Sequence, residues 1–303
     1  MYKICAVVVT HNRKTLLLRN IKSLLLQSYP LDILIFDNAS TDDTEQFLRE
    51  NNIIDKKNVF YVKSKFNTGG AGGFKFGAME AYEKGYDYMW LMDDDGYCLN
   101  NSTLQELISN IHLGDKVILN SYVTFNSISL EPTFPIDGIP TRKELLKKSI
   151  NMIIKGGSPY NGTLIPRSCF AEVGFNDERF FIYGDENDFY LRTIEHGYEW
   201  QTNMNSLYYH PINRTIKKSF NFLGLHVEIK NQPVWKYYLE VRNAEFNAIK
   251  HFGRSKYRLI GYLRVLIVSL LSSDKKFTRL KYGFLGIRDA KKEYFTRPLM
   301  FNK

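Results

Sequence analysis

Three adjacent carboxylates, Asp93, Asp94 and Asp95, stand directly behind the apolar run at residues 88–92. Like charges at this separation repel and raise one another's pKa, so a tight acidic cluster is stable only in full solvent or around a cation. Asp93 and Asp95 project to the same side of an extended chain and could both reach one Mg²⁺ or Mn²⁺ ion. Such ions often complete their coordination with phosphate oxygens, which predicts a diphosphate ligand. A solvated Asp-Gly turn is the alternative interpretation.

A second acidic cluster, Asp185, Glu186 and Asp188, lies between an aromatic run and a helix expected from about Asn187. Carboxylates are favourable near a helix N-terminus, and ordinary capping accounts for one of them better than for three. A carboxylate that is ionised here at neutral pH is a candidate general base. His210 follows an apolar, strand-like segment and is either a core histidine or a metal ligand.

The acidic triplet ends the last of four apolar, strand-like segments that alternate with helical spacing. Strand-then-helix units repeated over about 95 residues predict an α/β fold, with a parallel sheet and helices on its faces. From residue 235 onward the pattern is helical. The expected strands are 4–9, 32–36, 59–63 and 86–92, and the expected helices are 15–27, 43–50 and 74–84.

Polar residues follow each expected strand, and ligand sites in such sheets gather at the carboxyl ends of strands. The glycine-rich stretch "NTGGAGG" at 67–73 has neither the dinucleotide-binding spacing nor the P-loop spacing. Its glycines permit a ligand to approach the backbone closely, and a structural turn explains them equally well. Arg13 could pair with phosphate or be a surface charge, and Asp37 could accept a hydrogen bond from a base or serve a turn.

Length, apolar stretches, cysteines and charge limit the possible classes of protein. The 303 residues suffice for one large or two modest domains, and no stretch reaches the roughly 18 apolar residues of a membrane span. Three widely separated cysteines predict buried free thiols and a reducing cytoplasm. Residues 235–303 carry 16 Lys and Arg against 5 Asp and Glu. This basic region could contact an anionic membrane surface, notably through the amphipathic segment 257–271, or could pack on the sheet or another subunit.

Together these motifs resemble the family 2 glycosyltransferases, inverting enzymes of the GT-A fold that use nucleotide-sugars. The resemblance covers about residues 4–215 and rests on "VVVTHNR", "DNASTD", "DDD" and the block that runs from Tyr160 to Arg192. It implies that Asp37 contacts uracil, that Asp93 and Asp95 hold the metal and diphosphate, and that Glu186 is the base. Because related enzymes often have two aspartates at 185–186, Asp185 stays open as the alternative base.

The resemblance also assigns roles to the remaining motif residues and divides the chain. It implies a GT-A domain at 1–234, with a nucleotide-sugar half at about 1–96 and an acceptor half at about 97–234, followed by a basic helical region at 235–303. The implied nucleotide-sugar contacts are Thr10, Asn12, Arg13, Asp37, Asn67, Gly69, Gly70 and Asp94. The implied acceptor contacts are Tyr160, Asn161, Gly162 and Asp188, and the implied metal ligands are Asp93, Asp95 and His210.

Within the family the motifs look most like bacterial galactofuranosyltransferases, with rhamnosyltransferases next. This implies Mn²⁺- or Mg²⁺-dependent transfer of galactofuranose from UDP-galactofuranose to a glycan or lipid-diphosphate-linked acceptor, in the cytoplasm or peripherally at the inner face of the membrane. The alternatives are a rhamnosyltransferase that uses dTDP-rhamnose and, more distantly, a sugar-phosphate nucleotidyltransferase. A nucleic-acid-binding role for the basic region is disfavoured, because the acidic rim would repel a phosphate backbone.

Overall fold

The computed structural model describes residues 1–111, 116–212, 217–222, 225–254 and 259–296. By their internal contacts these residues form two compact units. The first comprises Met1–Glu178 and Phe189–Ile212, and the second comprises Arg179–Asp188 and the described part of Asn213–Lys303. The second unit therefore includes the short segment 179–188 and the described residues that follow Ile212. The sequence, by contrast, predicts one domain through residue 234.

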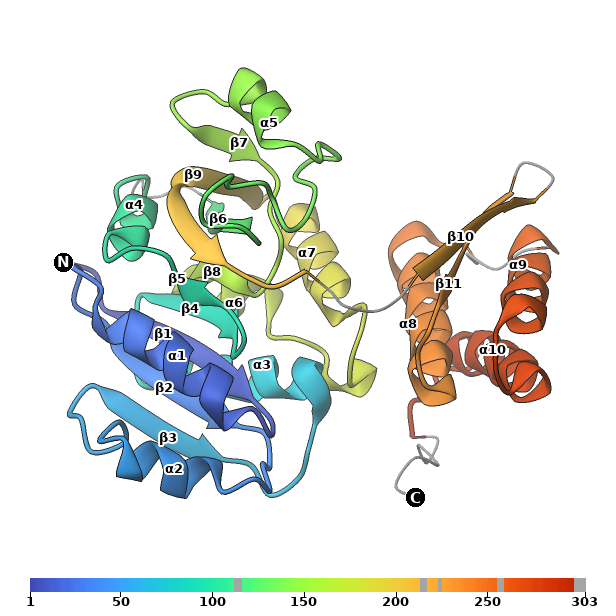
Figure 1. Ribbon diagram of the computed structural model, residues 1–303, viewed down its shortest axis with the longest axis horizontal. Helices are drawn as coiled ribbons and strands as arrows, with labels where there is room; N and C mark the ends of the chain where they lie inside the picture. Colours follow the sequence, from blue (N-terminus) through green and yellow to red (C-terminus); the bar gives the residue numbers. More distant parts are fainter. Residues whose placement is uncertain (112–115, 213–216, 223–224, 255–258, 297–303) are drawn as a thin grey trace. The chain divides into compact units, whose positions relative to one another are not determined.

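The first half of unit 1 is a parallel sheet in the strand order β3-β2-β1-β4, as Figure 1 shows. Alternate residues of β1 enter cores on opposite faces of the sheet: Val8 lies in one and Val7 in the other. Both are fully buried, which explains why this strand is a continuous apolar run rather than an alternating one. The strands are β1 (Ile4–Thr10), β2 (Asp32–Asp37), β3 (Val59–Lys63) and β4 (Tyr88–Asp93), and the helices are α1 (Lys14–Leu25), α2 (Thr44–Glu50) and α3 (Gly69–Glu83).

The second half of unit 1 extends the same sheet with strands of both directions. β8 pairs antiparallel with β4 and β6, and β9 pairs parallel with β6. The α/β architecture predicted from the sequence is confirmed. The elements are β5 (Tyr97–Cys98), α4 (Thr103–Ile108), β6 (Val117–Thr124), α5 (Arg142–Lys148), β7 (Ile153–Lys155), β8 (Asn161–Pro166), α6 (Arg167–Val173) and β9 (Glu199–Tyr209). The 3₁₀ turn Glu178–Phe180 and helix α7 (Asp185–Glu195) belong partly to unit 1 and partly to unit 2.

The three cysteines are buried and free, as predicted. Burial raises the pKa of Cys98 and of Cys169 to about 12 and that of Cys5 still further. All three thiols therefore stay protonated at neutral pH and act as small apolar side chains.

Helix α3 begins at Gly69, so the expectation that it begins near Phe74 was wrong. The glycines of 69–73 are not a turn before the helix but its first turns. A Cβ at Gly73 would lie 2.4 Å from Cγ1 of Val9, and one at Gly77 would lie 2.8 Å from Cγ1 of Val7. Because these glycines have no side chains, the backbone of α3 packs directly against the side chains of β1. This close packing outweighs the low helix propensity of glycine.

Among its described residues, unit 2 contains the antiparallel strand pair β10–β11, the helices α8, α9 and α10, and the start of α7. The helical C-terminal region is confirmed, but the hairpin was not predicted. Helix α10 packs on α8 so closely that a Cβ at Gly286 would lie 3.0 Å from the carbonyl oxygen of Tyr238. In the described part of the chain, no helix has the length and apolar content needed to span a membrane. The elements are β10 (Lys217–Phe222), β11 (Leu225–Lys230), α8 (Val234–Phe252), α9 (Leu259–Leu271) and α10 (Lys276–Lys291).

The contact between α3 and β1 gives a prediction about stability. Gly73→Ala should lower the free energy of unfolding by about 1–3 kcal/mol, because the new methyl group overpacks against Val9. Gly70→Ala is the matched control on the same helix, since nothing lies within 4 Å of its Cβ position. It should leave stability unchanged or raise it by up to about 1 kcal/mol through helix propensity. Urea unfolding curves measure both, and equal losses in the two variants would contradict the packing argument.

Candidate active site

The carboxyl ends of the parallel strands bring the predicted polar residues to one edge of the sheet. Val9 of β1 pairs with Asp93 of β4, and Thr10 pairs with Asp37 of β2. The residues that follow these strands therefore share one rim, as expected for an α/β sheet. The rim of unit 1 is the candidate site.

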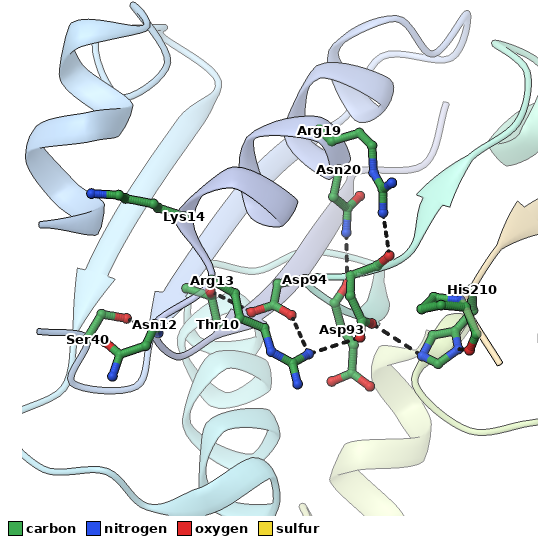
Figure 2. Close-up of polar contacts among 12 residues, drawn as sticks. Thr10, Asn12, Arg13, Lys14, Arg19, Asn20, Ser40, Asp93, Asp94 and His210 are labelled. Carbon is green, nitrogen blue, oxygen red and sulfur yellow. Dashed lines mark hydrogen bonds and ion pairs between the residues drawn. The ribbon is translucent and has the colours of Figure 1, made fainter. Parts of the chain in front are cut away.

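The three carboxylates of the triplet have different surroundings, and Figure 2 labels two of them, Asp93 and Asp94. Asp94 is buried: its Oδ2 accepts a 2.7 Å hydrogen bond from the Thr10 hydroxyl, and its Oδ1 accepts one of 3.2 Å from Nη1 of Arg13. Nη1 of Arg13 also lies 2.9 Å from Oδ2 of Asp95. Half of the Arg13 side chain remains exposed, at 51%. Asp94 thus fixes Arg13 at the rim, and Arg13 still faces solvent.

Asp93, Asp95 and His210 form a cluster that fits a hard divalent cation. One ligand atom of each lies within 4.8 Å of the other two. Nδ1 of His210 lies 2.8 Å from the carbonyl oxygen of Pro211, which can only accept, so Nδ1 carries a proton and Nε2 faces the cluster. Oδ1 of Asp95 is buried, makes no hydrogen bond, and lies 3.3 Å from that Nε2. Two carboxylates and an imidazole suit Mn²⁺ or Mg²⁺.

The carboxyl groups of Asp94 and Asp95 have pKa values shifted in opposite directions. Burial is the largest effect on Asp94 and raises its pKa to about 6, even though Thr10 and Arg13 stabilise the anion. Burial also opposes ionisation of Asp95, but His210 and Arg13 outweigh it and lower the pKa of Asp95. Burial likewise works against the charged form of His210, but Asp95 outweighs it and raises the pKa of the histidine. Asp95 is therefore ionised at neutral pH, as a metal ligand must be.

Two residues of α1 that sequence reasoning missed hold the backbone of the triplet. Asn20 is fully buried, and its Nδ2 donates a 2.8 Å hydrogen bond to the carbonyl oxygen of Asp93. Arg19 donates from Nη2 to the carbonyl oxygen of Asp95 at 2.8 Å, and its guanidinium lies 4.4 Å from the ring centroid of Tyr97. A signal was available in the sequence, because Asn20 is a polar residue on the otherwise apolar face of a helix.

The residues after β2 and β3 lie on the same rim. Asp37 is fully buried and accepts hydrogen bonds from the backbone N–H of Ser40, at 2.7 Å, and from the hydroxyl of Tyr61. Its carboxylate is thus already used within the protein, and the predicted contact with uracil stays a prediction. Asn12 bridges to the same loop: its Oδ1 accepts from the N–H of Thr41 at 2.7 Å.

Asn38, which was not among the predicted site residues, organises the start of α3. Its Nδ2 donates to the carbonyl oxygen of Gly69 at 2.8 Å and lies 3.3 Å from Oδ1 of Asn67. That same Oδ1 accepts from the N–H of Gly69 at 2.9 Å. Gly69 has φ +69°, which explains glycine at this position. Gly70 has open space at its Cβ position, so a ligand can approach the helix start there.

The predicted acceptor residues 160–162 are joined to the metal cluster through the backbone. The carbonyl oxygen of Tyr160 accepts from the N–H of Asp93 at 3.2 Å. The Tyr160 ring is buried and stacks on Phe74 with 4.3 Å between ring centroids. Oδ1 of Asn161 is buried without a hydrogen bond, and Gly162 has φ +79°. Contacts of these residues with an acceptor remain a prediction.

The second acidic cluster belongs to unit 2, at the start of α7. Asp185 is buried, while Glu186 is exposed. Asp188 is fully buried, and its Oδ1 lies 2.6 Å from Nζ of Lys250 and 2.9 Å from Nε2 of His251. Of the two candidate bases, only Glu186 is open to solvent. The Asp188 carboxylate is occupied by an ion pair, and its role toward an acceptor stays a prediction.

The sequence profile described as "Glycosyl transferase family 2" matches residues 5–165, more than half of the chain. The chain belongs to glycosyl transferase family 2. The match spans β1 to β8, and so includes the acidic triplet and the strands whose carboxyl ends build the rim.

This family 2 glycosyltransferase is 30% identical over 234 residues to galactofuranosyltransferase GlfT1 of Mycobacterium tuberculosis (strain ATCC 25618 / H37Rv), a match that covers 75% of this chain and 76% of that one. It is 24% identical over 250 residues to dTDP-rhamnosyl transferase RfbF of Shigella flexneri, covering 80% and 78%. The solved structure of mannosyltransferase PcManGT from Pyrobaculum calidifontis, in complex with GDP-Man and Mn²⁺, superposes with a TM-score of 0.55 at 12% identity, covering 96% of this chain and 75% of that one. The GT-A type of fold and the resemblance to galactofuranosyl- and rhamnosyltransferases are confirmed.

The geometry predicts which aspartates of the triplet bind a cation. Asp95→Asn should weaken Mn²⁺ binding at least about tenfold, because it removes an ionised oxygen ligand. Asp94→Asn is the matched control, since Asp94 faces Thr10 and Arg13 instead of the cluster, and it should cause a much smaller loss. Calorimetric titration of each full-length variant with MnCl₂, with and without UDP, measures the difference. Equal losses in the two variants would show that overall negative charge, and not coordination, attracts the ion.

Proposed function

We propose that this family 2 glycosyltransferase is metal-dependent and inverting, and that it transfers galactofuranose from UDP-galactofuranose. The observation that carries the proposal is the Asp93, Asp95 and His210 cluster at the carboxyl edge of the sheet. A divalent cation held there would neutralise charge that develops on the leaving diphosphate. The galactofuranose donor is supported by the 30% identity to the galactofuranosyltransferase GlfT1.

On the donor side, Arg13 is the group that meets the phosphates. Its guanidinium is held by Asp94 and Asp95 while half of its side chain stays exposed, so it is oriented before a ligand arrives. A pre-oriented guanidinium stabilises charge on phosphate oxygens without the cost of ordering the side chain during the reaction. The Thr10 hydroxyl keeps Asp94 in place through its 2.7 Å hydrogen bond. The open backbone at Gly70 leaves room for the sugar nucleotide.

On the acceptor side, Glu186 is the proposed general base. It removes the proton of the acceptor hydroxyl as the hydroxyl oxygen attacks the anomeric carbon from the face opposite the diphosphate. A single displacement inverts the configuration at that carbon and requires no covalent sugar intermediate. The exposure of Glu186 supports this role over Asp185, which is buried.

A second donor is favoured by a specific observation. The 24% identity to a dTDP-rhamnosyl transferase covers 80% of this chain, so dTDP-rhamnose is the alternative donor. Membership of glycosyl transferase family 2 disfavours the nucleotidyltransferase alternative.

The acceptor is proposed to be a glycan or a lipid-diphosphate-linked glycan at the inner face of the membrane. Unit 2 supports a membrane contact because it exposes large apolar side chains among basic residues: Leu271 is 50% and Phe277 is 85% exposed. Of the predicted amphipathic segment 257–271, positions 257 and 258 lie outside the described residues, and 259–271 form α9. Contact with a second copy of the chain is the alternative use of this surface.

A donor screen tests the proposed reaction. Release of UDP should be fastest from UDP-galactofuranose, slower from UDP-galactopyranose, and should stop when EDTA removes Mn²⁺ and Mg²⁺. Asp95→Ala should abolish the metal-dependent turnover. Faster release of dTDP from dTDP-rhamnose would establish the alternative donor. Turnover that survives thorough chelation would contradict metal dependence.

Replacing the proposed base separates binding from chemistry. Glu186→Gln should bind UDP as the wild type does and lower the transfer rate by about 10²- to 10⁴-fold, because the amide cannot take up the proton. Asp185→Asn is the matched control and should retain most of the transfer activity. The measurements are calorimetric UDP binding and initial transfer rates. Normal transfer by Glu186→Gln would move the base to Asp185.

The base assignment also predicts a pH dependence. Although Glu186 is exposed, the protein packed around it removes part of the hydration of its carboxylate; this desolvation, followed by repulsion from Asp185, raises its pKa from the ordinary 4.5 to about 8. A general base works when ionised, so kcat/KM should rise with pH through this raised pKa and level off above it. This limb should be missing from the residual activity of Glu186→Gln. A wild-type limb at or below pH 4.5 would contradict the assignment.

A further inference from the structure

We propose that one face of helix α8 holds the segment that carries Glu186, with Asn243 as the positioning residue. The inference rests on the proposed role of Glu186 as the base. It assigns to the C-terminal region a part in the reaction that is separate from any membrane contact. All of the contacts involved lie within unit 2.

The segment before α7 has a backbone that cannot hold its conformation by itself. Phe181 has φ +68° and Tyr183 has φ +65°, in the left-handed region that bulky residues rarely adopt. Gly184 follows with φ +87°. Non-glycine residues in this region are strained and persist only where surrounding contacts hold them in place. An external support is therefore needed, immediately before Asp185.

Asn243 supplies this support through an amide NH₂ group that faces three carbonyl oxygens, so that one of its two N–H groups is shared between two of them. Its Nδ2 lies 3.0 Å from the carbonyl oxygen of Phe180, 2.8 Å from that of Ile182 and 2.7 Å from that of Tyr183. Its Oδ1 accepts a 2.8 Å hydrogen bond from Nε of Arg242. A guanidinium can only donate, so this bond fixes which end of the amide faces the carbonyls. Asn243 is 1% exposed, and water cannot replace these bonds.

Arg242 and Asn247, which neighbour Asn243 on α8, bind further carbonyl oxygens at the two ends of the segment 179–184. Nη2 of Arg242 lies 3.1 Å from the carbonyl oxygens of both Arg179 and Phe180. Nδ2 of Asn247 donates to the carbonyl oxygen of Gly184 at 2.8 Å. A Cβ at Gly184 would lie 3.3 Å from both Cβ of Asn243 and Nδ2 of Asn247, so glycine is needed for the close approach as well as for its φ.

The far side of Glu186 is tied to the last turns of the same helix. Asp188 is fully buried and pairs with Lys250 and His251. Glu186 thus lies between two anchor points, Gly184 and Asp188, that are both attached to α8. The two attachments fix the backbone on each side of an exposed carboxylate, which is what a base requires to meet a hydroxyl at a constant distance.

Helix α8 is itself fixed on its other side by α10. The hydroxyl of Tyr238 donates a 2.9 Å buried hydrogen bond to Oδ2 of Asp289. This bond does not involve the carbonyl oxygens of 179–188, although the Tyr238 ring packs with Phe181 and Ile182 and its centroid lies 5.6 Å from the Arg242 guanidinium. Tyr238→Phe therefore removes a buried hydrogen bond from α8 and keeps the ring, which makes it the matched control for a purely structural loss.

The experiment compares Asn243→Ala, Asn247→Ala and Tyr238→Phe in the full chain. Asn243→Ala should raise amide hydrogen exchange across 181–187 and lower kcat for UDP-galactofuranose transfer about tenfold or more, with donor KM and UDP binding within about twofold of wild type. Asn247→Ala removes one carbonyl contact, so its effects should be smaller in both measurements. It also keeps the test open if Asn243→Ala does not fold. Tyr238→Phe should match the wild type in exchange over 181–187 and in kcat.

Glu186→Gln, measured in parallel, separates the two possible failures. If Glu186→Gln loses transfer while Asn243→Ala keeps the wild-type kcat, the positioning inference is wrong and the proposed base stands. If Asn243→Ala loosens 181–187 and neither variant loses transfer, the base assignment is wrong, and the inference falls with it. Unchanged exchange in Asn243→Ala, or an equal fall of kcat in Tyr238→Phe, would also overturn the inference.

Discussion

The repulsion among the three carboxylates at 93–95 is the constraint on which the first unit depends. Each carboxylate has its own surroundings: Asp94 is buried against Thr10 and Arg13, and Asp95 shares Arg13 and faces His210. The parallel register of β1 and β4 brings these side chains to one edge. Burial of Asp95 opposes its ionisation, and within the protein His210 and Arg13 are the groups that offset this cost. A cation shared with Asp93 and His210 would remove that cost.

Both acidic segments are positioned through their backbones, by polar side chains of a helix. On α1, Asn20 and Arg19 bind carbonyl oxygens of the triplet. On α8, Asn243 and Asn247 bind the carbonyl oxygens that precede Asp185. In each case these bonds fix the main chain without using a carboxylate oxygen. Buried amides suit this purpose because they bond strongly without adding charge beside the acids.

The periodic parts of the fold could be predicted from the sequence, and the parts that depend on contacts between distant residues could not. The strands β1 to β4 follow from apolar runs, and their shared rim follows from parallel pairing. The start of α3 was missed because close packing of Gly73 on Val9 overrides helix propensity. The hairpin of β10 and β11 was missed as well. Asn243 carries no motif, because its role arises only when α8 meets residues some 60 positions earlier in the chain.

The most direct measurement of the central claim is a crystal structure of the full chain grown with UDP and MnCl₂, with anomalous diffraction recorded for manganese. The account predicts an anomalous peak bound by Asp93, Asp95 and His210 and in contact with the diphosphate oxygens of UDP. UDP bound at the rim with no manganese at these three residues would contradict it.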